Sequence, residues 1–461
     1  MIDPLKQFNI ANKKSELPGK KAGEVSSSAK KEPPSENRTA DIFKLAGKGA
    51  VDLTPYGKLP VIITKKGNPD LNEIKSRIVK GFKAEEASIK EELSIINGMK
   101  VEVDPFNFEK LMKNIPPDSK VILDQNIPFI LLEKPSNPAD LDKRPSFDVS
   151  NSTLGLNRLW EKGYTGKGVG ICVIDSGIYP HKDFEGRIKA FVDMHDKKEK
   201  LHDPIGHGTH VASIALGSGV ESAGKYKGVA PEADLLGVRV TNQSEAIKGI
   251  QWAIENKDKY NIRVINLSLG VDSQASLEDD PFAQAAEKAW EKGLVVCVAA
   301  GNEGPNPGSI SSPGVSPSVI TVGNLDDKNT PERDDDTIYN DSSRGPTRFD
   351  NIAKPDLVAP GTNIYGALAP DCLMYDPKLP NHEGKYMAVS GTSQATPIVS
   401  GLAALLIQAN PGLSNMEIKE ILMNTSDKYL SDDKNTQGAG LVDPLEALEN
   451  ALEKADAKNE T

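Results

Sequence analysis

The chain has 461 residues, of which 26% are charged and 38% hydrophobic, and its formal net charge is −11. This length accommodates two or three domains, and the composition is typical of a globular protein. The negative charge argues against nucleic acid as the main partner, because phosphate binding needs clustered Lys and Arg, and the absence of any apolar run of about 18 residues argues against a membrane span.

The first part of the chain has the composition of a disordered segment. Residues 1–55 are rich in Lys, Ser, Glu, Pro and Gly, and we expect them to be disordered. No apolar stretch typical of a secretory signal peptide occurs near the start. Two of the three cysteines, Cys172 and Cys297, lie in apolar runs, and we interpret them as small buried side chains. We therefore expect a cytoplasmic protein, with non-standard export left open.

Residues 56–134 predict a small α+β domain. The expected elements are a strand at 59–64, a helix at 70–80, strands at 89–96 and 99–103 around the hairpin signal Asn97-Gly98, a helix at 105–114 and one or two strands within 121–132. This β-α-β-β-α-β order is typical of a ferredoxin-like domain. Residues 135–150 contain three prolines and predict a linker.

Residues 151–450 predict an α/β domain, followed by a charged tail at 451–461. The expected strands are 169–174, 234–240, 263–269, 294–300 and 319–322. The expected helices are 207–216, 244–255, 280–292, 392–408 and 415–424. This alternation predicts a parallel sheet with helices on both faces.

Three short motifs in this domain carry chemistry. They are VIDSG at 173–177, GHGTH at 206–210 and GTSQ at 391–394, and they contain Asp175, His207 and Ser393. A carboxylate, an imidazole and a hydroxyl are the groups that serine-based nucleophilic catalysis requires. Because reactive groups gather at the carboxyl ends of parallel strands, we expect a shared site at that edge.

The roles of the three residues follow from their chemistry. A serine hydroxyl is a weak nucleophile until a base such as His207 takes its proton. Asp175 would orient the imidazole and stabilise the imidazolium. Ser393 begins an expected helix, where free backbone N–H groups and the helix dipole favour an oxyanion. The side chain of Asn302 can donate a hydrogen bond to the same oxyanion.

Each of these residues also has an ordinary structural explanation. Ser393 fits a helix N-cap, His207 a buried helix histidine, and Asp175 and Asn302 turn positions. All four explanations would have to coincide on one catalytic set, and we therefore favour the catalytic interpretation.

With these motifs in this order, the chain resembles the subtilisin-like serine proteases, or subtilases, whose catalytic residues follow the order Asp, His, Ser. The resemblance runs from about residue 163 to 445, and the segments SSRGP at 342–346 and KPDLVAP at 354–360 are similar to the intracellular AprX-type branch. It implies a three-layer parallel-sheet domain with Asp175, His207 and Ser393 as the catalytic triad and Asn302 as oxyanion donor.

The resemblance also implies a set of substrate-binding residues. Those that would pair with the substrate backbone as an added strand are Ser268, Leu269 and Gly270. Those that would line the pocket for the side chain before the scissile bond are Ala299, Ala300 and Gly301. Glu303 would lie near the mouth of that pocket, whose small walls suit a large apolar side chain.

The sequence departs from the family pattern at several places. Gln394 stands where the family usually has Met, and the loop at 241–244 is shorter than usual. The loop at 217–227 lacks the Asn-rich sequence of a tight calcium site. The histidines without an assigned role show no metal-ligand spacing; they are His181, His195, His202 and His382. We therefore predict no metal ligands and no required cofactor, and we leave a calcium ion open without a location.

The function implied by the resemblance is hydrolysis of peptide bonds through an acyl-enzyme intermediate. The enzyme would be a serine endopeptidase made as a zymogen, expected to be monomeric, and its partners would be polypeptide substrates and its own inhibitory propeptide at 56–134. Autocleavage is expected near residues 130–135. Two alternatives stay open: a pseudoprotease that holds a partner protein, and a non-peptidase hydrolase such as an esterase.

Overall fold

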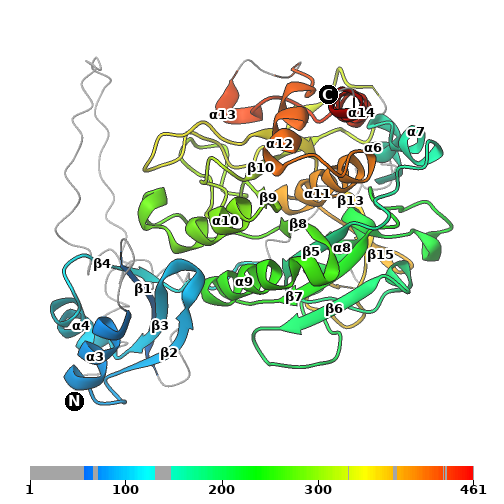
Figure 1. The fold of residues 1–461 in the computed structure, drawn as a ribbon. Coiled ribbons are helices and arrows are strands. Elements are labelled where there is room, and N and C mark those ends of the chain that lie inside the picture. The colour runs from blue at the N-terminus through cyan, green and yellow to red at the C-terminus, as the bar shows by residue number, and fades with distance from the viewer. Residues whose placement is uncertain are drawn as a thin grey trace, which may run out of the picture.

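The computed structural model describes residues 57–65, 71–129, 147–330, 332–376, 382–428, 430 and 433–459. A small N-terminal domain lies beside a larger C-terminal domain, with its sheet facing helices of the latter (Figure 1). The predicted disordered segment at 1–55 and most of the predicted linker fall outside the described residues.

The N-terminal domain has the predicted β-α-β-β-α-β order. Its elements are β1 (Leu59–Lys65), α3 (Leu71–Gly81), β2 (Ala87–Leu93), β3 (Gly98–Val103), α4 (Phe108–Asn114) and β4 (Ser119–Leu123). The antiparallel sheet has the order β2-β3-β1-β4. The hairpin differs from the expected two-residue turn, because Ser94–Ile96 forms a 3-10 turn that buries Ile96. Asn97 then takes the left-handed conformation that ends this turn.

Side-chain alternation along β1 explains how the two domains pack together. Val61 and Ile63 point into the core of the N-terminal domain, whereas Ile62 belongs to the continuous core of the C-terminal domain. Leu93 and Ile96 join Ile62 on that face. A strand places alternate residues on opposite faces. One face of this sheet therefore packs in the core of the N-terminal domain, and the other packs against the core of the C-terminal domain.

A parallel sheet with the strand order β11-β10-β9-β8-β5-β7-β6 forms the centre of the C-terminal domain, and β12 also pairs with β10. Its strands are β5 (Gly170–Asp175), β6 (Ile188–Asp193), β7 (Asp234–Arg239), β8 (Ile262–Leu267), β9 (Val295–Ala299), β10 (Ile320–Asp326), β11 (Thr337–Ile338) and β12 (Leu357–Pro360). Every pair is parallel except β10 with β11. The sequence analysis found β5, β7, β8, β9 and β10 but not β6, β11 or β12.

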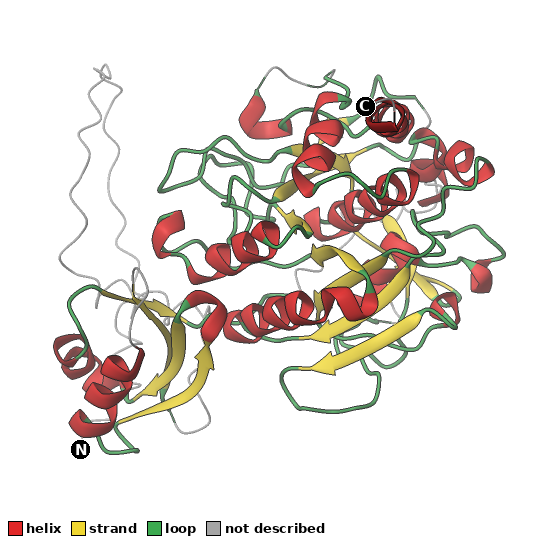
Figure 2. Cartoon of the chain, viewed as in Figure 1, coloured by secondary structure: helices red, strands yellow, loops and turns green. Residues whose placement is uncertain are grey.

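Helices cover both faces of this sheet (Figure 2). One face carries α8 (His207–Leu216) and α11 (Thr392–Ala409), and the other carries α9 (Gln243–Tyr260) and α10 (Pro281–Glu291). Both α8 and α11 are buried almost throughout, because each lies between the sheet and further chain. This is the three-layer α/β arrangement that the sequence predicts.

The remaining elements surround this core. They are α6 (Phe147–Thr153), α7 (Leu156–Glu161), β13 (Ile364–Ala367), β14 (His382–Glu383), β15 (Tyr386–Val389), α12 (Asn415–Asn424), α13 (Lys434–Gln437) and α14 (Pro444–Asn459). Helix α14 continues past residue 450, so the boundary expected there falls inside a helix that packs on α11. None of the described helices has both the length and the apolar character of a membrane span.

A substitution in α11 tests this core. Leu405 is fully buried, whereas Met416 on α12 is 49% exposed. We expect Leu405→Ala to lower the free energy of unfolding by about 2–5 kcal/mol, because it leaves a cavity, and Met416→Ala to change it by less than about 0.5 kcal/mol. Urea unfolding in the full-length Ser393→Ala chain, which lacks the predicted nucleophile, measures both. Equal effects would contradict the assigned packing of α11.

Candidate active site

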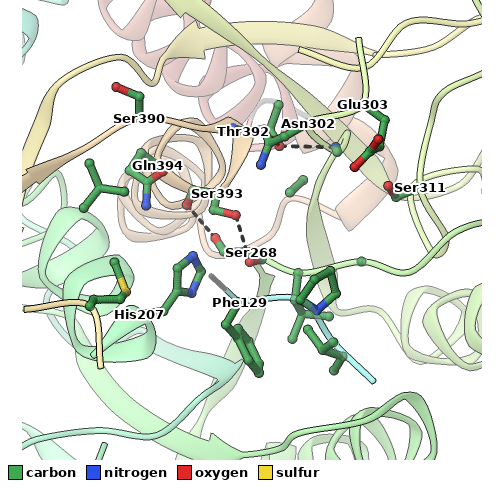
Figure 3. Close-up of a pocket in the computed structure, with 18 residues that line it drawn as sticks. Phe129, His207, Ser268, Asn302, Glu303, Ser311, Ser390, Thr392, Ser393 and Gln394 are labelled. Carbon is green, nitrogen blue, oxygen red and sulfur yellow. Dashed lines mark hydrogen bonds between the residues drawn. The ribbon is translucent and has the colours of Figure 1, made fainter. Parts of the chain in front are cut away.

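One pocket at the carboxyl edge of the sheet collects most of the predicted site residues. His207, Ser393 and Asn302 all line it, and Figure 3 shows them facing one another from α8, α11 and the loop after β9. Asp175 lies behind His207 at the end of β5. Strands β5 and β9 thus deliver their following residues to the same edge, as parallel strands do.

Asp175 and His207 form a buried hydrogen-bonded pair. His207 Nδ1 lies 2.8 Å from Asp175 Oδ1, and the side chains are only 6% and 1% exposed. The same carboxylate oxygen accepts a hydrogen bond from the backbone N–H of Ser176 at 2.7 Å. The pair fixes the imidazole so that its Nε2 edge is the part left for the pocket.

The local sequence explains how β5 and α8 approach so closely. A Cβ on Gly208 would lie 2.2 Å from the carbonyl oxygen of Gly177, so only glycine fits directly after His207. Asp203 accepts hydrogen bonds from the N–H groups of Gly206 and Thr209, both at 2.8 Å, at the start of α8. The sequence analysis missed this cap, although an Asp shortly before a helix start is a recognisable signal.

Ser393 is held by a reciprocal pair of hydrogen bonds with Ser268. Ser393 Oγ donates to the carbonyl oxygen of Ser268 at 3.1 Å, and Ser268 Oγ donates to the carbonyl oxygen of Ser393 at 2.8 Å. Among the described residues the Ser393 hydroxyl makes no hydrogen bond to His207. His207 and Ser393 nevertheless line the same pocket. A rotation about one side-chain bond is enough to change the hydrogen-bond partner of a serine hydroxyl.

The carboxamide of Asn302 is oriented by Thr392. Its Oδ1 accepts hydrogen bonds from Thr392 N at 2.9 Å and from Thr392 Oγ1 at 3.1 Å. Because the oxygen is engaged, the Nδ2 group is the part of the amide that can donate into the pocket. The sequence analysis did not identify Thr392 as the residue that sets this orientation.

Burial and charge act in opposite directions on the pair. Burial lowers the pKa of His207, but the charge of Asp175 and its hydrogen bond outweigh burial, so the pKa is raised above its ordinary value. Burial also raises the pKa of Asp175, partly offset by His207. A histidine with a raised pKa accepts a proton more readily, which suits a general base.

The predicted substrate-binding residues divide into two groups. Those that line the pocket are Ser268, Leu269, Gly270, Ala299 and Gly301, together with Glu303 and Ser311. Ala300 is not among the lining residues, and it packs instead with Ala283, Ile310 and Val315. The alternation that points Ala299 toward the pocket turns Ala300 away from it.

Three residues of the N-terminal domain also line the pocket. They are Ile127, Pro128 and Phe129. The Phe129 ring lies 5.6 Å from the imidazole of His207, measured between ring centres. Ile127 N donates to Thr241 O, and Gln243 N donates to Gln125 O, both at 2.9 Å. The segment 125–129 therefore lies along the edge at 241–243 as a short added strand that ends at His207.

A second cluster of potential ligands lies outside this pocket. Asp193, Asp196 and His202 place one ligand atom each within 4.8 Å of one another. Arg239 Nη1 already pairs with both carboxylates, at 3.0 and 3.3 Å. A cation would have to compete with that guanidinium, so the cluster is explained as an ion-pair network.

The pocket combines a hydroxyl, an imidazole that a carboxylate orients, and an amide donor. This is the set of groups that stabilises and attacks a carbonyl carbon in acyl transfer.

Comparison with known proteins places this chemistry in context. Residues 166–441 match the family model described as the subtilase family, Peptidase S8. The chain is 40% identical over 374 residues to serine protease AprX of Bacillus subtilis (strain 168), which covers 78% of this chain and 81% of that protein. It is 34% identical over 288 residues to Subtilisin Savinase of Lederbergia lenta, covering 61% and 91%.

Among solved structures, the crystal structure of fervidolysin from Fervidobacterium pennivorans is similar with a TM-score of 0.63. The match covers 87% of this chain and 62% of that one, at 21% identity, and it supports the fold alone.

The titration of His207 tests the electrostatics of the pair. We expect its pKa to lie above the ordinary 6.5 in the full-length chain, because the Asp175 charge outweighs burial. Asp175→Asn should lower the pKa of His207, because the variant lacks the carboxylate that contributes most to raising it while the effect of burial remains. The imidazole NMR signals measure both values. The control is Asp196→Asn, which changes a carboxylate next to His195 and should leave the pKa of His207 unchanged. If Asp175→Asn also left the pKa of His207 unchanged, the coupling between Asp175 and His207 would be contradicted.

Proposed function

The chain belongs to the subtilase family and is a serine endopeptidase, and on this premise we propose that Asp175, His207 and Ser393 form its catalytic triad, that Asn302 stabilises the oxyanion, and that residues 56–134 act as an inhibitory propeptide. The proposal rests on the buried hydrogen bond between Asp175 and His207, at a pocket that Ser393 and Asn302 also line.

The reaction divides into two halves. In acylation, Ser393 Oγ attacks the scissile carbonyl carbon while His207 takes the hydroxyl proton, and Asp175 stabilises the imidazolium. The Nδ2 group of Asn302 donates to the oxyanion, together with backbone groups at the start of α11. His207 then protonates the leaving amine. In deacylation, a water molecule gives a proton to His207 and attacks the acyl carbon. As the resulting tetrahedral intermediate collapses, His207 returns this proton to Ser393 Oγ, which frees the serine and releases the carboxylic acid product.

These groups supply a nucleophile, a base and an oxyanion donor from the chain itself. We therefore propose that the chemical step requires no cofactor. A polypeptide substrate suits the site, because the edges at 241–243 and at 268–270 offer backbone groups to an extended chain.

The zymogen proposal rests on where the N-terminal domain places its last described residues. Segment 125–129 already pairs with the edge at 241–243, and Phe129 covers His207. Asp124 accepts hydrogen bonds from Ser244 N and Ser244 Oγ, both at 2.8 Å, at the start of α9. A domain bound in this way blocks access of other chains to the catalytic pair.

Additional ion pairs connect the two domains away from the pocket. Lys120 pairs with Asp279 at 2.7 Å and Lys248 pairs with Glu91 at 2.8 Å. Such partly buried pairs at the domain boundary contribute modest stability individually, but they fix the orientation of the domain on α9 and its surroundings.

Mass spectrometry of the purified chain tests the proposal. Wild type should lose roughly its first 130 residues, as expected if cleavage follows segment 125–129, and should hydrolyse peptides. Ser393→Ala should stay full length and inactive, because it lacks the nucleophile. Comparing peptide and simple ester turnover at equal concentration separates a peptidase from an esterase. Processing of the Ser393→Ala chain in isolation would contradict self-cleavage.

A substitution at Asn302 tests the oxyanion role. In a subtilisin, losing this kind of donor costs about 2.7–4 kcal/mol of transition-state stabilisation, or about 10²–10³ in kcat. We expect Asn302→Leu to lower kcat by a factor of that order with a small change in KM, because the donor acts mainly in the transition state. Steady-state kinetics on the processed enzyme measure this, and a change confined to KM would contradict the assignment.

A further inference from the structure

A proline in α11 leaves the backbone carbonyl of Ser393 without its usual helical partner. In an α-helix, each carbonyl oxygen accepts a hydrogen bond from the N–H group four residues later. For Ser393 that residue is Pro397, which lies inside α11 and has no backbone N–H. The carbonyl oxygen of Ser393 instead accepts a hydrogen bond from Ser268 Oγ at 2.8 Å (Figure 3). A side chain from the segment after β8 therefore completes the first turn of α11.

Two further polar side chains, which lie behind the pocket, hold Ser268 in turn. Asn266 Nδ2, near the end of β8, donates a hydrogen bond to Ser268 Oγ at 2.9 Å. Ser400 Oγ, on α11, donates to Asn266 Oδ1 at 2.8 Å. An amide oxygen only accepts and an amide nitrogen only donates. The hydrogen bonds therefore run in one direction, from Ser400 through Asn266 and Ser268 to the carbonyl oxygen of Ser393.

This hydrogen-bonded chain is closed off from solvent. Asn266 and Ser400 are fully buried, and neither is among the residues that line the pocket. The hydroxyl of Ser400 also lies 3.2 Å from the carbonyl oxygen of Thr396 on its own helix, so it connects α11 to β8. In a buried network with every member paired, each lost bond would leave a polar group without a partner away from water. Such a network holds its groups in one arrangement.

Resting on the function proposed above, we propose that Asn266 and Ser400 are positioning residues of the protease. Acting through Ser268, they fix the first turn of α11, and with it the hydroxyl and the backbone N–H of Ser393. Ser393 Oγ also donates to the carbonyl oxygen of Ser268, so this one residue contacts both the backbone and the side chain of Ser393. A small misplacement of an attacking group slows the chemical step. The network therefore governs kcat, whereas substrate binding depends on residues that line the pocket.

Single substitutions test the positioning role by steady-state kinetics of the processed enzyme on a fluorescence-quenched peptide. We expect Ser400→Ala, which removes one hydroxyl, to lower kcat about three- to tenfold and to change KM by less than about twofold. Asn266→Ala should lower kcat by at least as large a factor, because it removes the donor to Ser268. Ser400→Thr, which keeps the hydroxyl, should restore most of kcat.

Ser426→Ala is the matched control, because Ser426 is also a buried serine whose Oγ donates to a helix carbonyl, that of Leu422 at 2.7 Å. It should leave kcat and KM unchanged. In the full-length Ser393→Ala chain, urea unfolding should show similar losses of stability for Ser400→Ala and Ser426→Ala. A loss of kcat in Ser400→Ala alone then comes from the position of Ser393 and not from a weaker fold.

A double-mutant cycle tests whether Asn266 acts through Ser268. Ser268→Ala removes the hydroxyl that receives the bond from Asn266 and donates to Ser393. If the network acts in series, adding Asn266→Ala to Ser268→Ala should lower kcat no further, although Asn266→Ala lowers it in the wild-type background. Two independent effects would instead multiply, and that result would overturn the proposed path through Ser268.

The outcomes separate this proposal from the proposed function. If wild type cleaves the peptide but Ser400→Ala and Asn266→Ala keep its kcat, or change KM alone, the positioning role is wrong and the protease stands. The same conclusion follows if Ser426→Ala lowers kcat as much as Ser400→Ala does. If wild type cleaves no peptide after processing, the proposed function itself fails, and the positioning role fails with it.

Discussion

The buried hydrogen bond between Asp175 and His207 is the constraint on which the rest of the site depends. A carboxylate without solvent exposure is costly unless hydrogen bonds compensate it. Asp175 has two such bonds, from Ser176 and His207, both on one oxygen. The end of β5 and the start of α8 must therefore stay in contact, and Gly208 is the residue that permits this distance. The carboxylate of Asp175 thus connects the end of β5 to the start of α8, which are distant in sequence.

Neutral groups position Ser393, the proposed nucleophile, in a comparable way. Ser393 and Ser268 exchange hydrogen bonds across the junction of α11 and the chain after β8, and Asn302 is fixed by Thr392, the neighbour of Ser393. Thr392 thus orients the amide of Asn302 and directly precedes Ser393 in the chain. This coupling preorganises the donors before substrate arrives, which is the property that makes electrostatic stabilisation effective. It also means that a shift of α11 would disturb Ser393 and Asn302 together.

The sequence predicted those parts of the molecule that have a local pattern. Apolar runs located β5, β7, β8, β9 and β10, and the short motifs singled out Asp175, His207, Ser393 and Asn302, which the structure brings together at one pocket. Features that depend on contacts between distant segments left no such signal. Phe129 meets His207, and Asp124 meets Ser244, across 120 residues in the second case. Ala300 was expected to line the pocket but packs away from it. The direction of a side chain at a strand end depends on the register of the strand, which composition does not specify.

The position of the N-terminal domain has a consequence for regulation. The described contacts of this domain with the pocket come from Ile127, Pro128 and Phe129. If the chain is cleaved after this segment, none of these contacts is lost, because the added strand, the hydrogen bonds from Ser244 to Asp124 and the shared apolar face all lie before the cut. Cleavage and release are therefore separate events. The first depends on the catalytic groups, and the second depends on how firmly the sheet of the N-terminal domain holds to α9 through Ile62, Leu93 and its ion pairs.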